Sequence, residues 1–143
     1  MQLKDSRISP AFENLPTKTP LGNIDELKIY GNDYPTHDGT GIRDYIHVLD
    51  LADAHIKAID YLDGNDSSII NLSSGIGCSV LDIVKITEKV TSRKIPYSFS
   101  PKRKGDPPIL ISTFDKAKEL LDWSPKYSIE DIVKSMWSIY SKN

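Results

Sequence analysis

The sequence predicts a small mixed α/β domain. Segments rich in β-branched and aromatic residues alternate with segments whose apolar residues recur at helical spacing. The 143 residues correspond to one domain by length, but leave no room for the strands and helices of a full doubly wound sheet. A hydrophobic content of 38% and a charged content of 27% are those of an ordinary globular domain.

The first residues are expected to lack regular structure. Pro10, Pro16 and Pro20 are so closely spaced that no helix of ordinary length fits between them. We therefore expect residues 1–23 to be a poorly ordered or remnant segment and residues 24–143 to form the domain.

Two short strands are expected next, at Leu27 to Tyr30 and at Tyr45 to Val48. The loop between them is dense in turn-forming residues, including Gly39 and Gly41, and glycine allows the backbone to bend tightly around a ligand. This loop leads to Arg43, so the sequence predicts a cradle for a small ligand.

A helix is expected to begin with Asp50 as N-cap and to stop at Gly64. Its apolar residues cover about 200° of the circumference, a face so wide that it requires partners on more than one side. The apolar positions are Leu51, Ala52, Ala54, Ile56, Ala58, Ile59 and Leu62, and the positions left mainly for solvent are Asp53, Lys57 and Asp60.

The rest of the chain repeats this alternation. The expected strands are Ser68 to Leu72, Ile95 to Phe99 and Ile109 to Ser112. Three further helices are expected: one that begins at Ser79 with Asp82, one from Asp115 through Leu121, and one that begins at Ser128 with Asp131.

Composition excludes several classes of function. With 18 Lys and Arg against 20 Asp and Glu, the formal net charge of -2 lacks the basic excess of a nucleic-acid-binding protein. Cys78 is the single cysteine, so no internal disulfide framework or thiolate metal cluster forms, and a reducing compartment is expected. We also expect no signal peptide and no membrane span, and therefore a cytoplasmic location.

The three histidines do not predict a metal site. His37, His47 and His55 are separated by ten and then eight residues, which matches no common zinc-binding spacing. His55 falls inside the apolar arc of its helix, so we expect it to be a hydrogen-bonded core residue.

The segment Ser73 to Ser79 lies between an expected strand and an expected helix, where a dinucleotide-binding glycine loop would be sought. It holds Gly75 and Gly77, but Val80 stands at the third glycine position. A tight turn is the better interpretation.

Two basic features suggest anion binding. The planar guanidinium of Arg43 suits phosphate oxygens, although a salt bridge to Asp44 or another acid would explain it equally well. The run from Pro101 to Asp106, PKRKGD, is by itself typical of a solvated charged loop.

The segment from Ile29 to Leu62, IYGNDYPTHDGTGIRDYIHVLDLADAHIKAIDYL, resembles the UDP-glucose 4-epimerases of the extended short-chain dehydrogenase/reductase family. PKRKGD is similar to their PRREGD motif. The resemblance covers roughly the C-terminal 40% of such an enzyme. It implies the substrate-binding domain of an extended short-chain dehydrogenase/reductase without the N-terminal Rossmann domain, acting on UDP-glucose and UDP-galactose in galactose metabolism.

The resemblance also implies site residues. Arg43 and Arg103 match arginines that hold the diphosphate of the UDP-sugar, and Asp106 matches an acid that accepts hydrogen bonds from ribose hydroxyls. Tyr30 matches an aromatic residue at the uracil, although an aromatic residue ending a strand is otherwise usually core. Leu110 stands where bacterial epimerases often carry tyrosine, which suggests room for an N-acetylated UDP-hexose.

The family transfers a hydride through bound NAD, with the tyrosine of a Tyr-x-x-x-Lys pair as base. None of the seven tyrosines here is followed by lysine four positions later, and the glycine-rich cofactor fingerprint is absent. We therefore expect no catalytic residue in this chain and no NAD binding by this chain alone.

Three interpretations remain open. The first is a truncated epimerase that keeps part of a UDP-sugar site. The second is half of a split epimerase, whose partner polypeptide supplies the Rossmann domain. The third is a non-enzymatic binding or interaction module.

Overall fold

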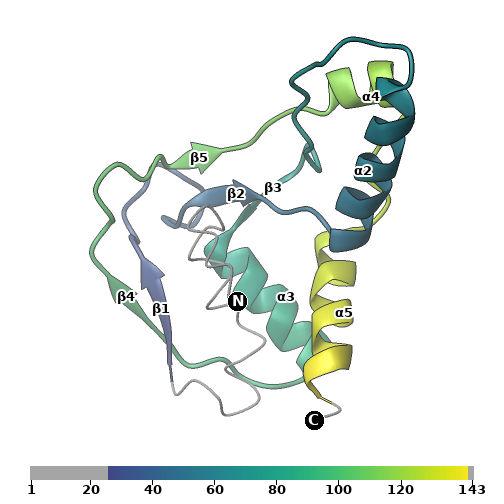
Figure 1. Cartoon of the computed structure of the whole chain (residues 1–143). Coiled ribbons are helices and arrows are strands. Elements are labelled where there is room, and N and C mark those ends of the chain that lie inside the picture. Colours follow the sequence, from purple (N-terminus) through teal and green to yellow (C-terminus); the bar gives the residue numbers. More distant parts are fainter. Residues whose placement is uncertain (1–25, 142–143) are drawn as a thin grey trace, which may run out of the picture.

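The computed structural model describes residues 26–141 and confirms a small mixed α/β fold (Figure 1). Its strands form two small sheets. In one sheet, β1 (Leu27–Tyr30) pairs in parallel with β4 (Tyr97–Ser100). In the other, β2 (Ile42–Asp44) lies between antiparallel β3 (Gly77–Ser79) and parallel β5 (Ile109–Leu110). The segment of residues 1–23, which was expected to be poorly ordered or a remnant, lies outside the described residues.

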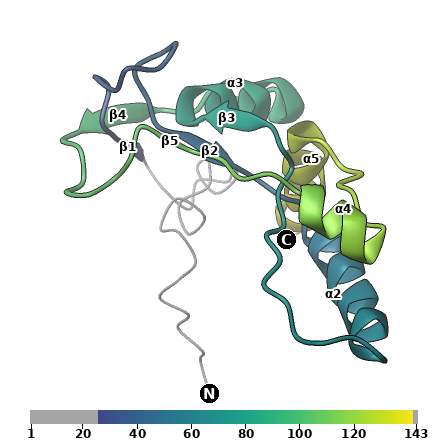
Figure 2. The same cartoon turned by 90° about the horizontal axis from the view of Figure 1, so that it is seen from above.

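Four helices accompany these strands in the described part of the chain. They are α2 (Val48–Leu62), α3 (Val80–Thr91), α4 (Asp115–Leu121) and α5 (Ile129–Tyr140). Helix α3 packs against α5 and helix α2 against α4. Helices α2 and α4 lie beyond the ends of β2 and β5, away from β1 and β4 (Figures 1 and 2). No described helix is long and apolar enough to cross a membrane.

Three separate clusters of buried side chains form the core of the described residues. One joins Tyr45 and Cys78 to α3 and α5, and a second packs Leu27 and Ile29 of β1 on α3. The third surrounds Trp123 between α2 and α4. The core of the described residues is therefore divided into three parts.

Two helices begin as the sequence predicted. In α3, Ser79 Oγ accepts from the backbone N–H of Asp82 while the Asp82 carboxylate accepts from the Ser79 N–H. Ser128 and Asp131 form the same reciprocal capping box at α5. Each box pairs two backbone donors that a helix start otherwise leaves unsatisfied.

The predicted start of α2 was wrong. The helix begins at Val48, and its N-cap is His47, whose Nδ1 accepts from the Leu49 N–H at 3.1 Å. Asp50 lies inside the first turn and is buried; its carboxylate accepts from the backbone N–H groups of Lys126 and Tyr127. The expected strand at Tyr45 to Val48 does not form: Val48 begins the helix, and the strand lies at Ile42–Asp44 instead.

The other strand predictions met mixed outcomes. Leu27 to Tyr30 is confirmed, whereas the later strands are shifted or shorter than predicted, at Tyr97–Ser100 and Ile109–Leu110. The predicted strand from Ser68 to Leu72 is wrong for the described chain, because this segment pairs with no strand there.

The expected orientation of α2 was also wrong. His55 is exposed, and its Nδ1 lies 2.6 Å from the carbonyl oxygen of Leu51. Lys57 Nζ donates to the carbonyl oxygen of Asp122, and Asp53 pairs with Lys126 at 3.2 Å. Two of the charged residues expected to face solvent therefore face the chain itself, and apolar residues are left exposed.

Candidate functional site

Arg43 lies in the central strand β2, and the two neighbouring strands hold it in place. Its Nη1 donates to the carbonyl oxygen of Ile42 at 2.8 Å, and its Nη2 lies 3.9 Å from Oδ1 of Asp106. Of the alternative salt bridges, the one to adjacent Asp44 does not form, because Asp44 is engaged elsewhere, whereas the contact with Asp106 is a salt bridge to another acid. Arg43 thus directs its charge toward the loop before β5.

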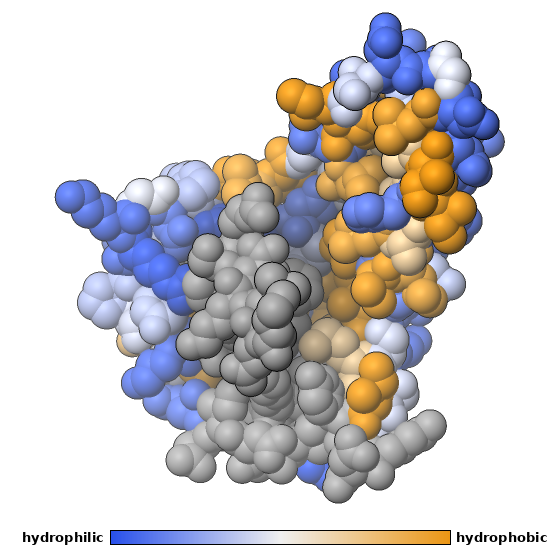
Figure 3. All heavy atoms as spheres, in the orientation of Figure 1, coloured by the Kyte–Doolittle hydropathy of each residue, from blue (hydrophilic) through white to orange (hydrophobic). Residues whose placement is uncertain are grey.

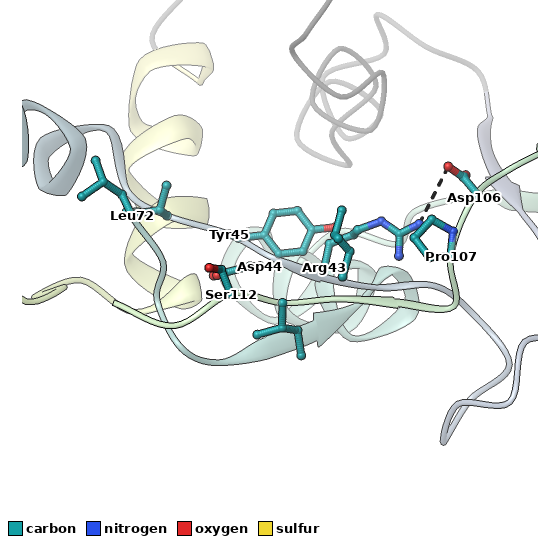
Figure 4. Close-up of a pocket in the computed structure, with 10 residues that line it drawn as sticks. Arg43, Asp44, Tyr45, Leu72, Asp106, Pro107 and Ser112 are labelled. Atoms are coloured by element: carbon teal, nitrogen blue, oxygen red, sulfur yellow. Dashed lines mark ion pairs between the residues drawn. The ribbon is translucent and has the colours of Figure 1, made fainter. Parts of the chain in front are cut away.

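A cavity of about 370 Å³ opens beside this pair (Figure 4). Arg43 and Asp106 lie at one end of it, and Leu72 lies toward the other. Most of the remaining lining is apolar, which suits a ligand with a charged end and a less polar body. The lining residues are Arg43, Asp44, Tyr45, Ile46, Leu72, Asp106, Pro107, Leu110, Ile111 and Ser112.

Tyr45 lines this cavity but is not suited to act as a base. Burial, with a smaller effect of Cys78, raises the pKa of its phenol to about 12, against an opposing effect of Arg43. The phenol therefore keeps its proton at neutral pH, and Tyr45 belongs to the core cluster behind the cavity.

Tyr30 and Arg103 form a second part of the site. Tyr30 is the last residue of β1 and is 39% exposed. It is therefore not buried in the core, which was the alternative role for an aromatic residue at the end of a strand. The guanidinium carbon of Arg103 lies 4.0 Å from the centroid of its ring, a cation–π contact. Together they present an aromatic ring and a cation at the end of a strand.

One turn connects the two parts. The backbone N–H of Asp106 donates to the carbonyl oxygen of Arg103 at 3.3 Å. The same short loop therefore carries Arg103 to Tyr30 and Asp106 to Arg43. Four residues that the sequence singled out are thus linked, and Leu110 lines the adjoining cavity.

Sequence reasoning missed two carboxylates that shape the site. Asp44 accepts hydrogen bonds from the hydroxyls of Ser73 and Ser74 and from the Ser74 N–H at 3.0 Å. It thereby fixes the turn that contains Gly75, at φ +71°. Its serine partners lie 29 and 30 residues further along the chain, so no local sequence pattern predicts these hydrogen bonds.

Asp38 is the second of these carboxylates. It accepts from the N–H and hydroxyl of Thr40, at 2.9 and 2.8 Å, and from the Ser79 hydroxyl. Burial acts to raise the pKa of this carboxyl, but these hydrogen bonds outweigh it and the pKa is lowered. Asp38 therefore ties the turn-rich loop before Arg43 to the start of α3.

At the start of α3, where a glycine loop would hold a pyrophosphate, the backbone donors are paired within the chain. The N–H of Val80 donates to Gly41, that of Leu81 to Thr40 and that of Asp82 to Ser79, so these donors are not available to a pyrophosphate. A side chain at Gly77 would meet Ile111 and Ile42, which shows that this glycine serves packing.

The histidines occupy three separate places. His37 lies beside Asp82 and Asp38, at 3.0 and 3.6 Å. His47 is buried, stacks on Tyr127 and lies 3.2 Å from the hydroxyl of Ser135. Within the described chain they do not converge, and only His37 has two carboxylates beside it.

Comparison with known proteins places this geometry in a family. The model of the GDP-mannose 4,6 dehydratase family matches residues 13–136. The UDP-glucose 4-epimerase of Lacticaseibacillus casei is 51% identical over 114 residues, which are 78% of this chain and 34% of that protein. The enzyme of Rhizobium leguminosarum bv. trifolii is 43% identical over 124 residues, 86% of this chain and 38% of that protein.

Solved structures agree. The UDP-glucose 4-epimerase of Bifidobacterium longum, in complex with NAD+ and UDP, superposes on this chain with a TM-score of 0.86 at 39% sequence identity. The match covers 91% of this chain and 39% of the epimerase chain. The UDP-Glc/GlcNAc 4-epimerase of Campylobacter jejuni gives 0.82 at 38% identity, with 94% and 41% covered. This chain thus spans between a third and about two fifths of these relatives, and it belongs to the extended short-chain dehydrogenase/reductase family of the UDP-glucose 4-epimerases.

Proposed function

We propose that this chain is the UDP-sugar-binding portion of a UDP-glucose 4-epimerase-like protein. The observation that carries the proposal is the turn between Arg103 and Asp106. It joins an aromatic ring, two guanidinium groups and a carboxylate beside one cavity.

Each group suits one part of a nucleotide-sugar. The exposed ring of Tyr30 offers a surface for stacking a flat base. Asp106 is an acceptor for ribose hydroxyls, and Arg43 and Arg103 are fork-shaped donors for the diphosphate oxygens. The apolar cavity beside Arg43 is left for the hexose.

The proposal extends to the type of hexose. Leu110 lines the cavity and is 60% exposed, so it leaves more room than a tyrosine would. We therefore infer that an N-acetylated UDP-hexose fits as well as UDP-glucose.

We further propose that the isolated chain binds without catalysing. It has no tyrosine followed by lysine four positions later, and the donors at the start of α3 are already paired within the chain. Hydride transfer through NAD would then require residues that are not in this chain.

Calorimetric titration with UDP-glucose tests the proposal. Arg43→Ala and Arg103→Ala should each weaken binding about tenfold or more, because each removes a charge-assisted hydrogen bond to the diphosphate. Arg93→Ala is the matched control: Arg93 lies against Trp137, away from these residues, and its removal changes the net charge equally. It should leave affinity unchanged.

Circular dichroism should show that all four proteins are folded. A folded wild-type chain that releases no heat with UDP-glucose would contradict the proposal and favour an interaction module. Equal weakening of binding by all three variants would mean that net charge, and not these two side chains in particular, determines the affinity.

A further inference from the structure

Residues 101–106, which we call the PKRKGD loop, carry three consecutive cations with different surroundings. Lys102 contacts the loop that follows β1, and Arg103 lies over the ring of Tyr30. Lys104 is exposed and makes no hydrogen bond, ion pair or ring contact with the other residues of 26–141. Figure 3 shows hydrophilic side chains gathered at this end of β1 and β4. The proposed function uses Arg103 and leaves the two lysines without a role.

Lys102 makes three contacts with two consecutive residues. Its Nζ donates to the carbonyl oxygen of Asp33 at 3.0 Å and lies 3.0 Å from Oδ1 of the same residue. The ammonium also lies 4.5 Å from the centroid of the buried Tyr34 ring, a cation–π contact. An exposed ion pair alone stabilises little, but three contacts from one ammonium fix its position. Lys102 therefore ties the PKRKGD loop to a loop 69 positions earlier in the chain.

The backbone after β1 is shaped to accept the stem of this lysine. Gly31 is buried and has φ +86°, a conformation that glycine adopts readily. Its N–H donates at 2.8 Å to the carbonyl oxygen of Ser100, the residue before the PKRKGD loop. A Cβ on Gly31 would lie 2.9 Å from Cγ of Lys102, closer than a Cβ atom approaches such a group. The stem of Lys102 is thus held by packing against backbone as well as by the charge at its end.

Lys102 immediately precedes a residue of the candidate site. Arg103 and Asp106 also contact the rest of the molecule, through Tyr30 and Arg43. In the proposed function, however, these groups are engaged by the ligand. Lys102 is a side chain of the same loop that holds the loop in place whether or not a ligand is bound.

We propose that Lys102 is a positioning residue for a nucleoside diphosphate. It clamps the PKRKGD loop to Asp33 and Tyr34, and so holds Arg103 and Asp106 where they meet the ligand. Because the loop is ordered in advance, binding does not have to supply the free energy of ordering it. The proposal rests on the proposed function for the identity of the ligand, whereas the clamp is present in the chain without ligand.

Calorimetric titration of the full chain with UDP tests the role of the clamp. Lys102→Met keeps an apolar stem and removes the charge; it should weaken binding about five- to tenfold, because an ion pair and a cation–π contact are lost together. Lys104→Met is the matched control, since it removes the same charge from the same loop, and it should leave the affinity unchanged. Lys102→Arg keeps a cation over Tyr34 and beside Asp33, so it should restore most of the affinity.

Asp33→Asn separates the clamp from a direct attraction between Lys102 and the diphosphate. If Lys102 acted only by attracting the diphosphate, removing a nearby anion would leave UDP affinity the same or raise it. If the clamp matters, Asp33→Asn should weaken binding about two- to fivefold, and Lys102→Met should then have a smaller effect than in the wild type. Unchanged or raised affinity in Asp33→Asn overturns the proposal, as does equal weakening by Lys102→Met and Lys104→Met.

A second measurement uses no ligand. The backbone N–H groups of Tyr34 and Asp106 are hydrogen-bonded within the two loops that Lys102 joins. Their hydrogen exchange should be at least about threefold faster in Lys102→Met and unchanged in Lys104→Met, because only the first variant loosens these loops. Circular dichroism should show that all variants are folded.

The two measurements distinguish the failure of this proposal from that of the proposed function. A folded wild-type chain that binds no UDP contradicts the proposed function, and the exchange rates then decide whether Lys102 holds the loop. Unchanged exchange in Lys102→Met overturns the clamp whatever the affinity for UDP.

Discussion

The guanidinium carbon of Arg103 lies 4.0 Å from the centroid of the Tyr30 ring. These residues are 73 positions apart, yet β1 and β4 pair in parallel and bring the ends of both strands together. Each side chain restricts the orientation of the other, so the part of the site assigned to the base and the part assigned to the diphosphate are physically coupled.

We expect this coupling to appear in UDP affinity. Tyr30→Leu and Arg103→Ala should each weaken binding, and the double variant should lose less than the sum by about 0.5–1.5 kcal/mol, because the first substitution already removes the contact. Calorimetry on the four proteins measures this difference. Tyr30→Leu combined with Arg43→Ala serves as the control, since Arg43 contacts Asp106 instead. Strict additivity of the first pair would show that the contact does not matter for binding.

Asp50 anchors the chain after α4 to helix α2. Its buried carboxylate accepts from two backbone N–H groups, those of Lys126 and Tyr127, at 3.1 and 3.2 Å. Asp50→Ala should lower the free energy of unfolding by about 1.5–3 kcal/mol, because two backbone N–H groups lose a charged acceptor. Urea denaturation followed by circular dichroism measures it.

Asp53→Ala is the matched control, because Asp53 lies one turn along the same helix and its pairing with Lys126 is exposed. Asp53→Ala should lower the free energy of unfolding by only about 0–1 kcal/mol. Equal losses for both variants would mean that Asp50 acts only through general helix electrostatics.

Local sequence rules predicted the features whose partners are near in sequence. The capping boxes at Ser79 and Ser128 join residues three positions apart, and both form. Asp50 shows the limit of this approach, because aspartate has a strong local preference for N-caps. Its actual partners lie 76 and 77 residues away, and His47 takes the cap.

The predicted strand from Ser68 to Leu72 failed for a different reason. The segment has the composition and alternation of a strand, but within residues 26–141 it pairs with no other strand, and local sequence patterns do not specify the pairing partner. In the site, Arg103 and Asp106 were predicted from the resemblance to the epimerases, whereas Arg43 was already a candidate from the chemistry of its guanidinium. Asp44 was missed because its partners are remote in sequence.

Cys78 is expected to react slowly with thiol reagents. Burial, with smaller effects of Asp82 and Asp38, raises the pKa of its thiol to about 11. At pH 8 its thiolate fraction should be about two orders of magnitude below that of an exposed cysteine, whose pKa is about 8.5. Alkylation by iodoacetamide in native buffer should be correspondingly slow and should accelerate in urea. Equal rates in both conditions would contradict the buried position.

Leu110 is the residue expected to control which hexose fits. It lines the cavity and pairs with Arg43 in the register of β5 against β2. Leu110→Tyr should weaken binding of UDP-N-acetylglucosamine at least tenfold relative to UDP-glucose, a difference of about 1.4 kcal/mol, because the larger ring fills the space of the N-acetyl group. Ile109→Tyr places the same ring at the preceding strand position, which does not line the cavity. The ratio of the two affinities should therefore change in the first variant alone, and a ratio that moves equally in both would place the selectivity elsewhere.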